Sequence, residues 1–290
     1  MRADRDKALS GISGDLATSV LAGEPPGGWD TTPPGPSRDH AIATLSASLH
    51  LDVLRRLTQK PASVGAVLPT ADQVASLARL SFDHDDAAGQ RYVDAVRLTG
   101  VAIDAVYLQL ITPAARQLGE MWADDLCTFV DVTIGIGRLQ QIVRMLGPVF
   151  VGDGGRAVHD RRAVLMAVPG EQHTFGLLMA AEFLRRAGWI LDCAAPPDSA
   201  RAARLVRGEW FCFVGFSLST EAGIGTLSAC IRAIRKASRN RDIGVLVGGN
   251  LFLEHPDLVR RVGADAMAAD GPCAVTAAQQ FLRYGAGAQL

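Results

Sequence analysis

The hydrophobic pattern of this chain changes its period near the middle. Between about residues 39 and 150, apolar side chains recur at steps of three or four positions, which is typical of amphipathic helices. The first helix is indicated by Leu45, Leu49, Val53, Leu54 and Leu57. The later helices are expected over residues 74–80, over 89–101 with the same helix continuing to 118, and over 129–146. Four or five such helices joined by short connections predict a helical bundle.

After Pro148 the pattern becomes one of short apolar runs that alternate with helical stretches. The runs predict five buried strands, over residues 163–168, 189–194, 211–216, 244–249 and 264–269. The helical stretches cover residues 173–187, 199–207, 223–238, 255–262 and 272–283. Buried strands that alternate with helices form parallel sheets of the Rossmann or flavodoxin type. The predicted fold class is therefore all-α plus α/β, with the bundle followed by a five-stranded parallel sheet.

A segment rich in proline and glycine precedes the first helical pattern. Residues 23–36 contain five prolines and four glycines, a density that sustains neither a helix nor an internal strand. The sequence thus predicts three parts: a flexible segment over 1–38, a helical bundle over 39–150 and a Rossmann-like domain over 151–290.

Composition narrows the function classes. The 290 residues include 29 Lys and Arg against 30 Asp and Glu, whereas proteins that grip nucleic acid usually carry a basic surplus, so we expect no direct specific binding to DNA. The chain shows neither an apolar run of 18 residues nor a secretory signal, so we expect no membrane association. Its five cysteines lack metal or redox spacing, which predicts buried free thiols and a cytoplasmic location.

The first loop with candidate chemistry follows the first predicted strand. Ligands of parallel sheets bind at the carboxyl ends of the strands. Glu171 stands two residues before His173, and Thr174 and Gly176 follow. The carboxylate could orient the imidazole, as partners of metal-bound histidines do, and Gly176 would admit a bulky group. Alternatively, Glu171 caps the next helix and His173 is an exposed residue of its first turn.

Two further strands end in loops that could contact a ligand. Ser217, Ser219 and Thr220 place three hydroxyls after the third strand, where they could equally cap a helix. Gly248 and Gly249 follow the fourth strand and could either leave bare backbone for a ligand or form a tight turn.

The order and spacing of these three loops resemble the family that binds cobalamin base-off, with histidine as the lower ligand. The family motif is Asp-x-His-x-x-Gly, followed by Ser-x-Leu or Ser-x-Thr and then Gly-Gly. The resemblance implies that His173 binds cobalt and that Gly176 is the motif glycine. It also implies that the serine loop, Ser217 to Thr220, and the Gly248–Gly249 pair flank the displaced dimethylbenzimidazole tail. Glu171 departs from the usual Asp, which puts its bond to His173 in doubt.

The helical half carries a second part of the resemblance. Residues 118–139 resemble the bundle that caps the upper face of cobalamin in methionine synthase and in light-sensing B12 regulators. Trp122 would then lie over the upper axial position; alternatively, it packs inside the bundle. Light-sensing regulators fused to a DNA-binding domain carry a glutamate and a histidine where this chain has Val132 and Thr133. A different histidine, His40, is therefore our candidate upper ligand, with a solvated helix-start residue as the alternative.

Taken together, the motifs resemble most closely the AerR/PpaA group of cobalamin-binding antirepressors. This resemblance implies a light-responsive, non-enzymatic regulator that acts by contact with a CrtJ/PpsR-type repressor of photosynthesis genes. The cofactor would be adenosyl-, methyl- or hydroxocobalamin. Two alternatives stay open: a corrinoid carrier subunit of a methyltransferase, and a haem-based redox sensor with His173 as axial ligand. The acidic stretch Asp83-His84-Asp85-Asp86 is either a metal site or a solvated turn, and the sequence favours the turn.

Overall fold

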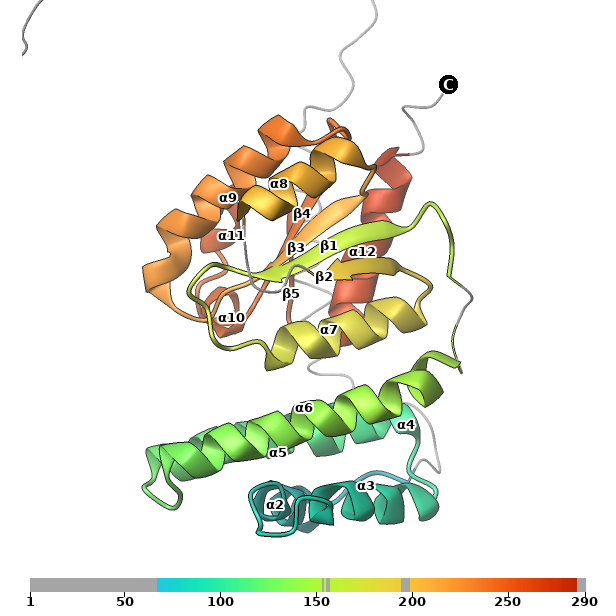
Figure 1. Ribbon diagram of the computed structural model, residues 1–290, viewed down its shortest axis with the longest axis vertical. Coiled ribbons are helices and arrows are strands. Elements are labelled where there is room, and N and C mark those ends of the chain that lie inside the picture. The colour runs from blue at the N-terminus through green and yellow to red at the C-terminus, as the bar shows by residue number, and fades with distance from the viewer. Residues whose placement is uncertain (1–66, 153, 155–156, 194–198, 286–290) are drawn as a thin grey trace, which may run out of the picture. The chain divides into compact units, whose positions relative to one another are not determined.

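The computed structural model describes residues 67–152, 154, 157–193 and 199–285 (Figure 1). The predicted helix at Leu45 to Leu57 lies outside these residues, as do His40 and the proline-rich segment. The described part begins with four helical segments: α2 (Ala71–Leu80), α3 (Ala88–Leu98), a segment that runs through α4 (Ile103–Ala105), the π-helical turn η1 (Val106–Ile111) and α5 (Thr112–Ala123), and α6 (Phe129–Gly152).

Local sequence signals explain where the first helices begin and end. Thr70 caps α2 because its hydroxyl accepts a hydrogen bond from the Gln73 N–H, while the Gln73 side chain accepts one from the Thr70 N–H. Gly100 follows α3 with a φ of 92°, a conformation that glycine adopts without steric cost. The predicted continuation from residue 89 to 118 is therefore wrong, because the chain turns after Leu98 and a new helix starts at Ile103.

The end of α6 also differs from the expectation. Proline lacks an N–H and usually ends a helix, yet α6 continues past Pro148 to Gly152. Leu146 and Phe150, on either side of this proline, are buried in the core of the bundle. Packing of the last turn against that core offsets the loss of one helical hydrogen bond.

The second half is a five-stranded parallel sheet, which confirms the predicted fold class. The strand order is β2 (Ile190–Cys193), β1 (Arg162–Ala167), β3 (Phe213–Ser217), β4 (Gly244–Gly248) and β5 (Ala266–Ala268), and each neighbouring pair is parallel. This is the flavodoxin-like order, in which the chain reverses its direction of strand addition between β1 and β3. The loops after β1 and β3 therefore leave the sheet side by side.

Helices cover both faces of the sheet (Figure 1). Alternate strand residues such as Val164 and Leu165 enter two separate hydrophobic clusters, as a sheet buried on both faces requires. One cluster includes α7 (Phe175–Arg186) and α12 (Gly271–Gly285), and the other includes α8 (Ser199–Gly208), α9 (Ile224–Ala237), α10 (Asn250–Glu254) and α11 (Leu258–Val262).

Helix α7 also contributes to the core of the helical bundle. Phe183 on α7 packs edge-on against Phe150 of α6, with ring centroids 4.9 Å apart, and Phe150 stacks on Tyr107. Arg186 forms an ion pair with Asp104 at the same contact. This hydrophobic cluster contains residues from both sides of the predicted boundary at residue 150. The division into three parts stays a prediction. Among the described helices, none combines the length and the apolar character that crossing a bilayer requires.

Candidate functional site

Backbone hydrogen bonds hold the three loops of interest together at the carboxyl edge of the sheet. The Val168 N–H, just after β1, donates to the Ser217 carbonyl at 3.0 Å. The Leu218 N–H, just after β3, donates to the Gly248 carbonyl at 2.9 Å. The histidine, serine and double-glycine loops are therefore neighbours in space, as their positions after parallel strands predict.

The Glu171 carboxylate is the centre of this arrangement. Its side chain is 1% exposed and accepts three hydrogen bonds. Oε1 accepts from the His173 N–H at 2.7 Å and lies 2.6 Å from His173 Nδ1, while Oε2 accepts from the Ser219 N–H at 2.6 Å. Glu171 thus fastens the histidine loop to the serine loop, and the Glu–His contact that the sequence left in doubt is present.

The charge of Glu171 sets the tautomer of His173. Burial raises the pKa of the Glu171 carboxyl, but the hydrogen bonds from His173 and Ser219 outweigh burial and leave this pKa below its ordinary value. An ionised carboxylate only accepts hydrogen bonds, so His173 Nδ1 carries the proton that faces it. In the neutral imidazole, Nε2 is then the acceptor, and the His173 side chain is 71% exposed. An imidazole held in this way is suited to bind a metal through Nε2.

The start of α7 leaves room beside this histidine. Thr174, not Glu171, occupies the N-cap position, so the alternative role of Glu171 as a helix cap is wrong. The Thr174 hydroxyl accepts a long hydrogen bond, 3.5 Å, from the Gln140 side chain of α6. Apart from its chain neighbours and the adjacent backbone of α7, no described atom lies within 4 Å of the place where a Cβ would stand at Gly176. The first turn of α7 could therefore accept a bulky group against its backbone.

The serine loop contributes both a buried and an exposed part. Ser217 is the last residue of β3 and is 6% exposed, whereas Ser219 is half-buried and Thr220 is exposed. Thr220 precedes the short 3-10 turn η2 (Glu221–Gly223), and within the described structure its side chain makes no capping hydrogen bond. The hydroxyl of Thr220 is thus available to a ligand.

In the double-glycine loop, the chain passes so close to the backbone of neighbouring segments that little room is left for side chains. Gly249 has a φ of 114°, and a Cβ added there would stand 2.1 Å from the Leu218 carbonyl oxygen. A Cβ at Gly248 would stand 3.3 Å from the Ala268 carbonyl oxygen. Gly249 is therefore required by the way β4 ends beside the serine loop, a role that holds with or without a ligand.

Trp122 lies at the surface of the bundle. It is 51% exposed at the end of α5 and contacts Phe129, 65% exposed at the start of α6, with ring centroids 6.1 Å apart. Leu126, between them, is 70% exposed. The alternative that Trp122 packs in the bundle core is therefore wrong. Thr133 is exposed as well, and its hydroxyl donates to the Phe129 carbonyl.

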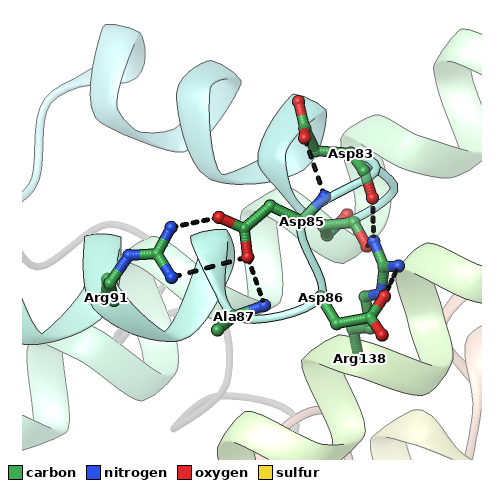
Figure 2. Close-up of polar contacts among 7 residues, drawn as sticks. Asp83, Asp85, Asp86, Ala87, Arg91 and Arg138 are labelled. Atoms are coloured by element: carbon green, nitrogen blue, oxygen red, sulfur yellow. Dashed lines mark hydrogen bonds and ion pairs between the residues drawn. The ribbon is translucent and has the colours of Figure 1, made fainter.

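The acidic stretch between α2 and α3 is a turn stabilised by arginines, as Figure 2 shows. Asp85 pairs with Arg91, and Asp86 pairs with Arg138 of α6. The hydrogen bond from Arg91 is the main cause that lowers the pKa of Asp85. No group of three or more potential metal ligands occurs among the residues that the structure describes.

Comparisons with known proteins reveal a family match, a relative and a similar fold. Residues 161–279 match the B12 binding domain. A relative, the "Uncharacterized 20.5 kDa protein in bchF-crtJ intergenic region" of Rhodobacter capsulatus, is 27% identical over 177 residues, which cover 61% of this chain and 92% of the relative. The monomethylamine corrinoid protein of Methanosarcina barkeri has a similar structure, with a TM-score of 0.61 and 12% identity over 72% of this chain and 98% of that one. At this identity the likeness shows the fold alone.

Proposed function

We propose that this protein binds cobalamin at the carboxyl edge of its sheet, with His173 as the lower cobalt ligand, because residues 161–279 match the B12 binding domain. The observation that carries the proposal is the Glu171 carboxylate, which holds His173 Nδ1 and leaves Nε2 free. The donor set fits the cofactor, because a neutral imidazole is a good ligand for cobalt. The open space at Gly176 fits a bulky group beside that ligand.

In this proposal the residues of the three loops have separate tasks. His173 binds the metal, Glu171 fixes the tautomer of its ring, and Ser219 fixes Glu171 through a backbone N–H. The exposed hydroxyl of Thr220 and the half-buried backbone of Gly248 would lie beside the tail of the cofactor. An alkylcobalamin, when bound, would supply a cobalt–carbon bond that light can cleave.

The exposed apolar residues at the corner between α5 and α6 fit the role of a cap. Trp122, Leu126 and Phe129 together leave a large apolar surface in contact with solvent. Exposed apolar clusters of this kind mark binding sites in soluble proteins. In our proposal this corner covers the upper face of the cofactor and excludes water from it.

We further propose that the protein is a regulator that acts by contact with a CrtJ/PpsR-type repressor. The relative named for its place between bchF and crtJ supports this, as does the balanced charge, which disfavours direct DNA binding. The two alternatives require different properties. A corrinoid carrier of a methyltransferase must cycle through Co(I) with a partner enzyme, whereas a haem sensor must bind haem through His173.

Reconstitution of the purified protein with methyl-, adenosyl- and hydroxocobalamin, and separately with haem, tests the cofactor. We expect base-off cobalamin spectra with a histidine ligand, and a change on illumination of the alkyl forms. His173→Ala should lose this spectrum, while His159→Ala, which removes a fully exposed imidazole elsewhere on the sheet domain, should keep it. An unchanged spectrum and affinity in His173→Ala, or preferential binding of haem, would refute the proposal.

Pull-down of a CrtJ/PpsR-type repressor in darkness and in light tests the regulatory role. We expect the amount of bound repressor to change with the state of the cofactor, and we expect no specific retardation of promoter DNA by the protein alone. Light-independent capture, or sequence-specific DNA binding at physiological salt, would contradict this role. Methyl transfer from the loaded protein to an acceptor with a partner methylase would favour the corrinoid carrier instead.

A further inference from the structure

One side of α6 exposes a stripe of apolar residues that bundle helices normally bury. Ile134, Met145 and Val149 are 39%, 47% and 46% exposed. Arg138 and Gln141 lie between them in the sequence, and the five residues follow one another at steps of three or four. All five therefore lie on the same side of the helix. A stripe of this kind is the usual contact surface between packed helices.

The part of this stripe from Ile134 to Met145 forms one wall of a groove between α6 and α3. The groove has a volume of about 580 Å³, and Ala87, Gly89 and Gln90 of the α3 side line its other wall. A Cβ at Gly89 would stand only 3.4 Å from the end of the Ile142 side chain, so the two helices touch below the groove. The Asp86–Arg138 pair of Figure 2 lies at its border.

We propose that residues 41–57 of this chain, which lie outside the described part, dock in this groove as an additional helix of the bundle. Leu45, Leu49, Val53 and Leu57 recur at four-residue steps and give this segment an apolar face of its own. As a helix, Leu45 to Leu57 would be about 18 Å long, and the stripe from Ile134 to Met145 is about 17 Å long. The two apolar surfaces therefore match in length. The proposal goes beyond the proposed function and does not depend on it.

The connection to α2 and the charges favour this segment over other occupants. Twelve residues, 58–69, lie between Leu57 and Thr70, the N-cap of α2, and an extended chain of that length spans about 40 Å. A tether of this kind gives the segment a local concentration on the order of millimolar, well above that of a second copy or a partner at ordinary concentrations. Arg55 and Arg56 are cations, and Asp86, which stays 88% exposed although it pairs with Arg138, places a carboxylate at the border of the groove.

Limited proteolysis of the full-length protein with trypsin tests whether the segment is held. Arg55 and Arg56 are cleavage sites inside it, and docking should protect them. Ile134→Asp and Met145→Asp, which change exposed residues of the groove, should speed cleavage there several-fold. Leu253→Asp, at a similarly exposed apolar residue of the sheet domain, should leave the rate unchanged. Equal cleavage rates in all four proteins would overturn the proposal.

Substitutions within residues 41–57 provide the reciprocal test. Met145 should be oxidised slowly by hydrogen peroxide in the wild type, because the docked helix would cover its sulfur. Leu49→Asp should raise this oxidation rate several-fold, whereas Thr44→Asp, on the opposite side of the predicted helix, should not. The same rate in all three proteins would overturn the proposal.

A photo-crosslinker identifies the occupant directly. With benzoylphenylalanine in place of Met145, we expect adducts to residues 41–57 of the same chain. A mixture of isotopically light and heavy protein distinguishes these from adducts between chains. Adducts between two copies, to another part of the chain, or none at all would each overturn the proposal. Circular dichroism of the variants checks that their helix content is unchanged.

Discussion

The backbone N–H of Ser219 donates a 2.6 Å hydrogen bond to Oε2 of Glu171, a residue 48 positions earlier in the chain. The other carboxylate oxygen holds the ring of His173. One side chain thus joins the loop after β1 to the loop after β3, at the point where the sheet reverses its strand order. The orientation of the candidate metal ligand consequently depends on the serine loop as well as on its own.

The first prediction concerns the length of the Glu171 side chain. Glu171→Ala should weaken cobalamin binding by about 10- to 100-fold, as loss of a partner that orients a metal-bound histidine generally does. Glu171→Asp keeps the charge but is shorter by one methylene, so it should keep one of the two loop contacts and give a smaller loss. Titration of the cofactor by absorbance measures both. Glu221→Ala, in the exposed turn after the serine loop, is the matched control. Wild-type affinity in Glu171→Ala would contradict this role.

The second prediction separates two glycines of the site. Gly249→Ala should destabilise the fold by about 1–3 kcal/mol even without cofactor, because of its positive φ and the Leu218 carbonyl 2.1 Å from the new Cβ. Gly176→Leu should instead leave the melting temperature of the free protein nearly unchanged and weaken cofactor binding, because the new side chain enters open space. Thermal unfolding with and without cobalamin distinguishes the two. Equal losses of stability would show that the space at Gly176 is needed for folding.

The third prediction concerns the thiols, for which the sequence predicted uniform burial. Cys212, Cys230 and Cys273 are buried, but Cys193 is exposed and Cys127 is half-buried, so the expectation is wrong for these two. Burial raises the pKa of the Cys212 thiol, which further lowers its reactivity. Iodoacetamide should therefore label Cys193 first in the native protein, with Cys212 labelled only on unfolding. Mass spectrometry of the labelled peptides measures the order, and early labelling of Cys212 would contradict it.

The fourth prediction concerns the upper ligand after photolysis. Thr133 is exposed and stands where the light-sensing regulators that the sequence resembles carry a histidine, so a protein ligand has to come from elsewhere. His40 is our candidate, since it stands beside the proline-rich segment and could move onto the bundle. His40→Ala should then change the spectrum of the photoproduct of alkylcobalamin-loaded protein and its binding to the repressor, while His50→Ala should not. An identical photoproduct and identical repressor binding in both variants would leave water or another residue as the ligand.

Several expectations failed or stayed incomplete because they depend on contacts between distant segments. The sequence left two places open for Trp122, over the cofactor or inside the bundle core, because aromatic residues at helical spacing are usually buried. Its 51% exposure rules out the core. Pro148 predicted the end of a helix from its own chemistry, but the buried side chain of Phe150 keeps the next turn helical. Both outcomes follow from packing, which no local pattern records.

The sequence by itself determined the elements of the sheet domain and the order of its loops, because buried strands and amphipathic helices have different hydrophobic periods. It also placed Glu171 two residues before His173, close enough for one to orient the other. Only the tertiary structure decided that Glu171 also binds Ser219, and that Gly249 passes against the Leu218 carbonyl. These contacts depend on the register of adjacent parallel strands. Register is fixed by the packing of whole strands between layers of helices, so no short stretch of chain determines it.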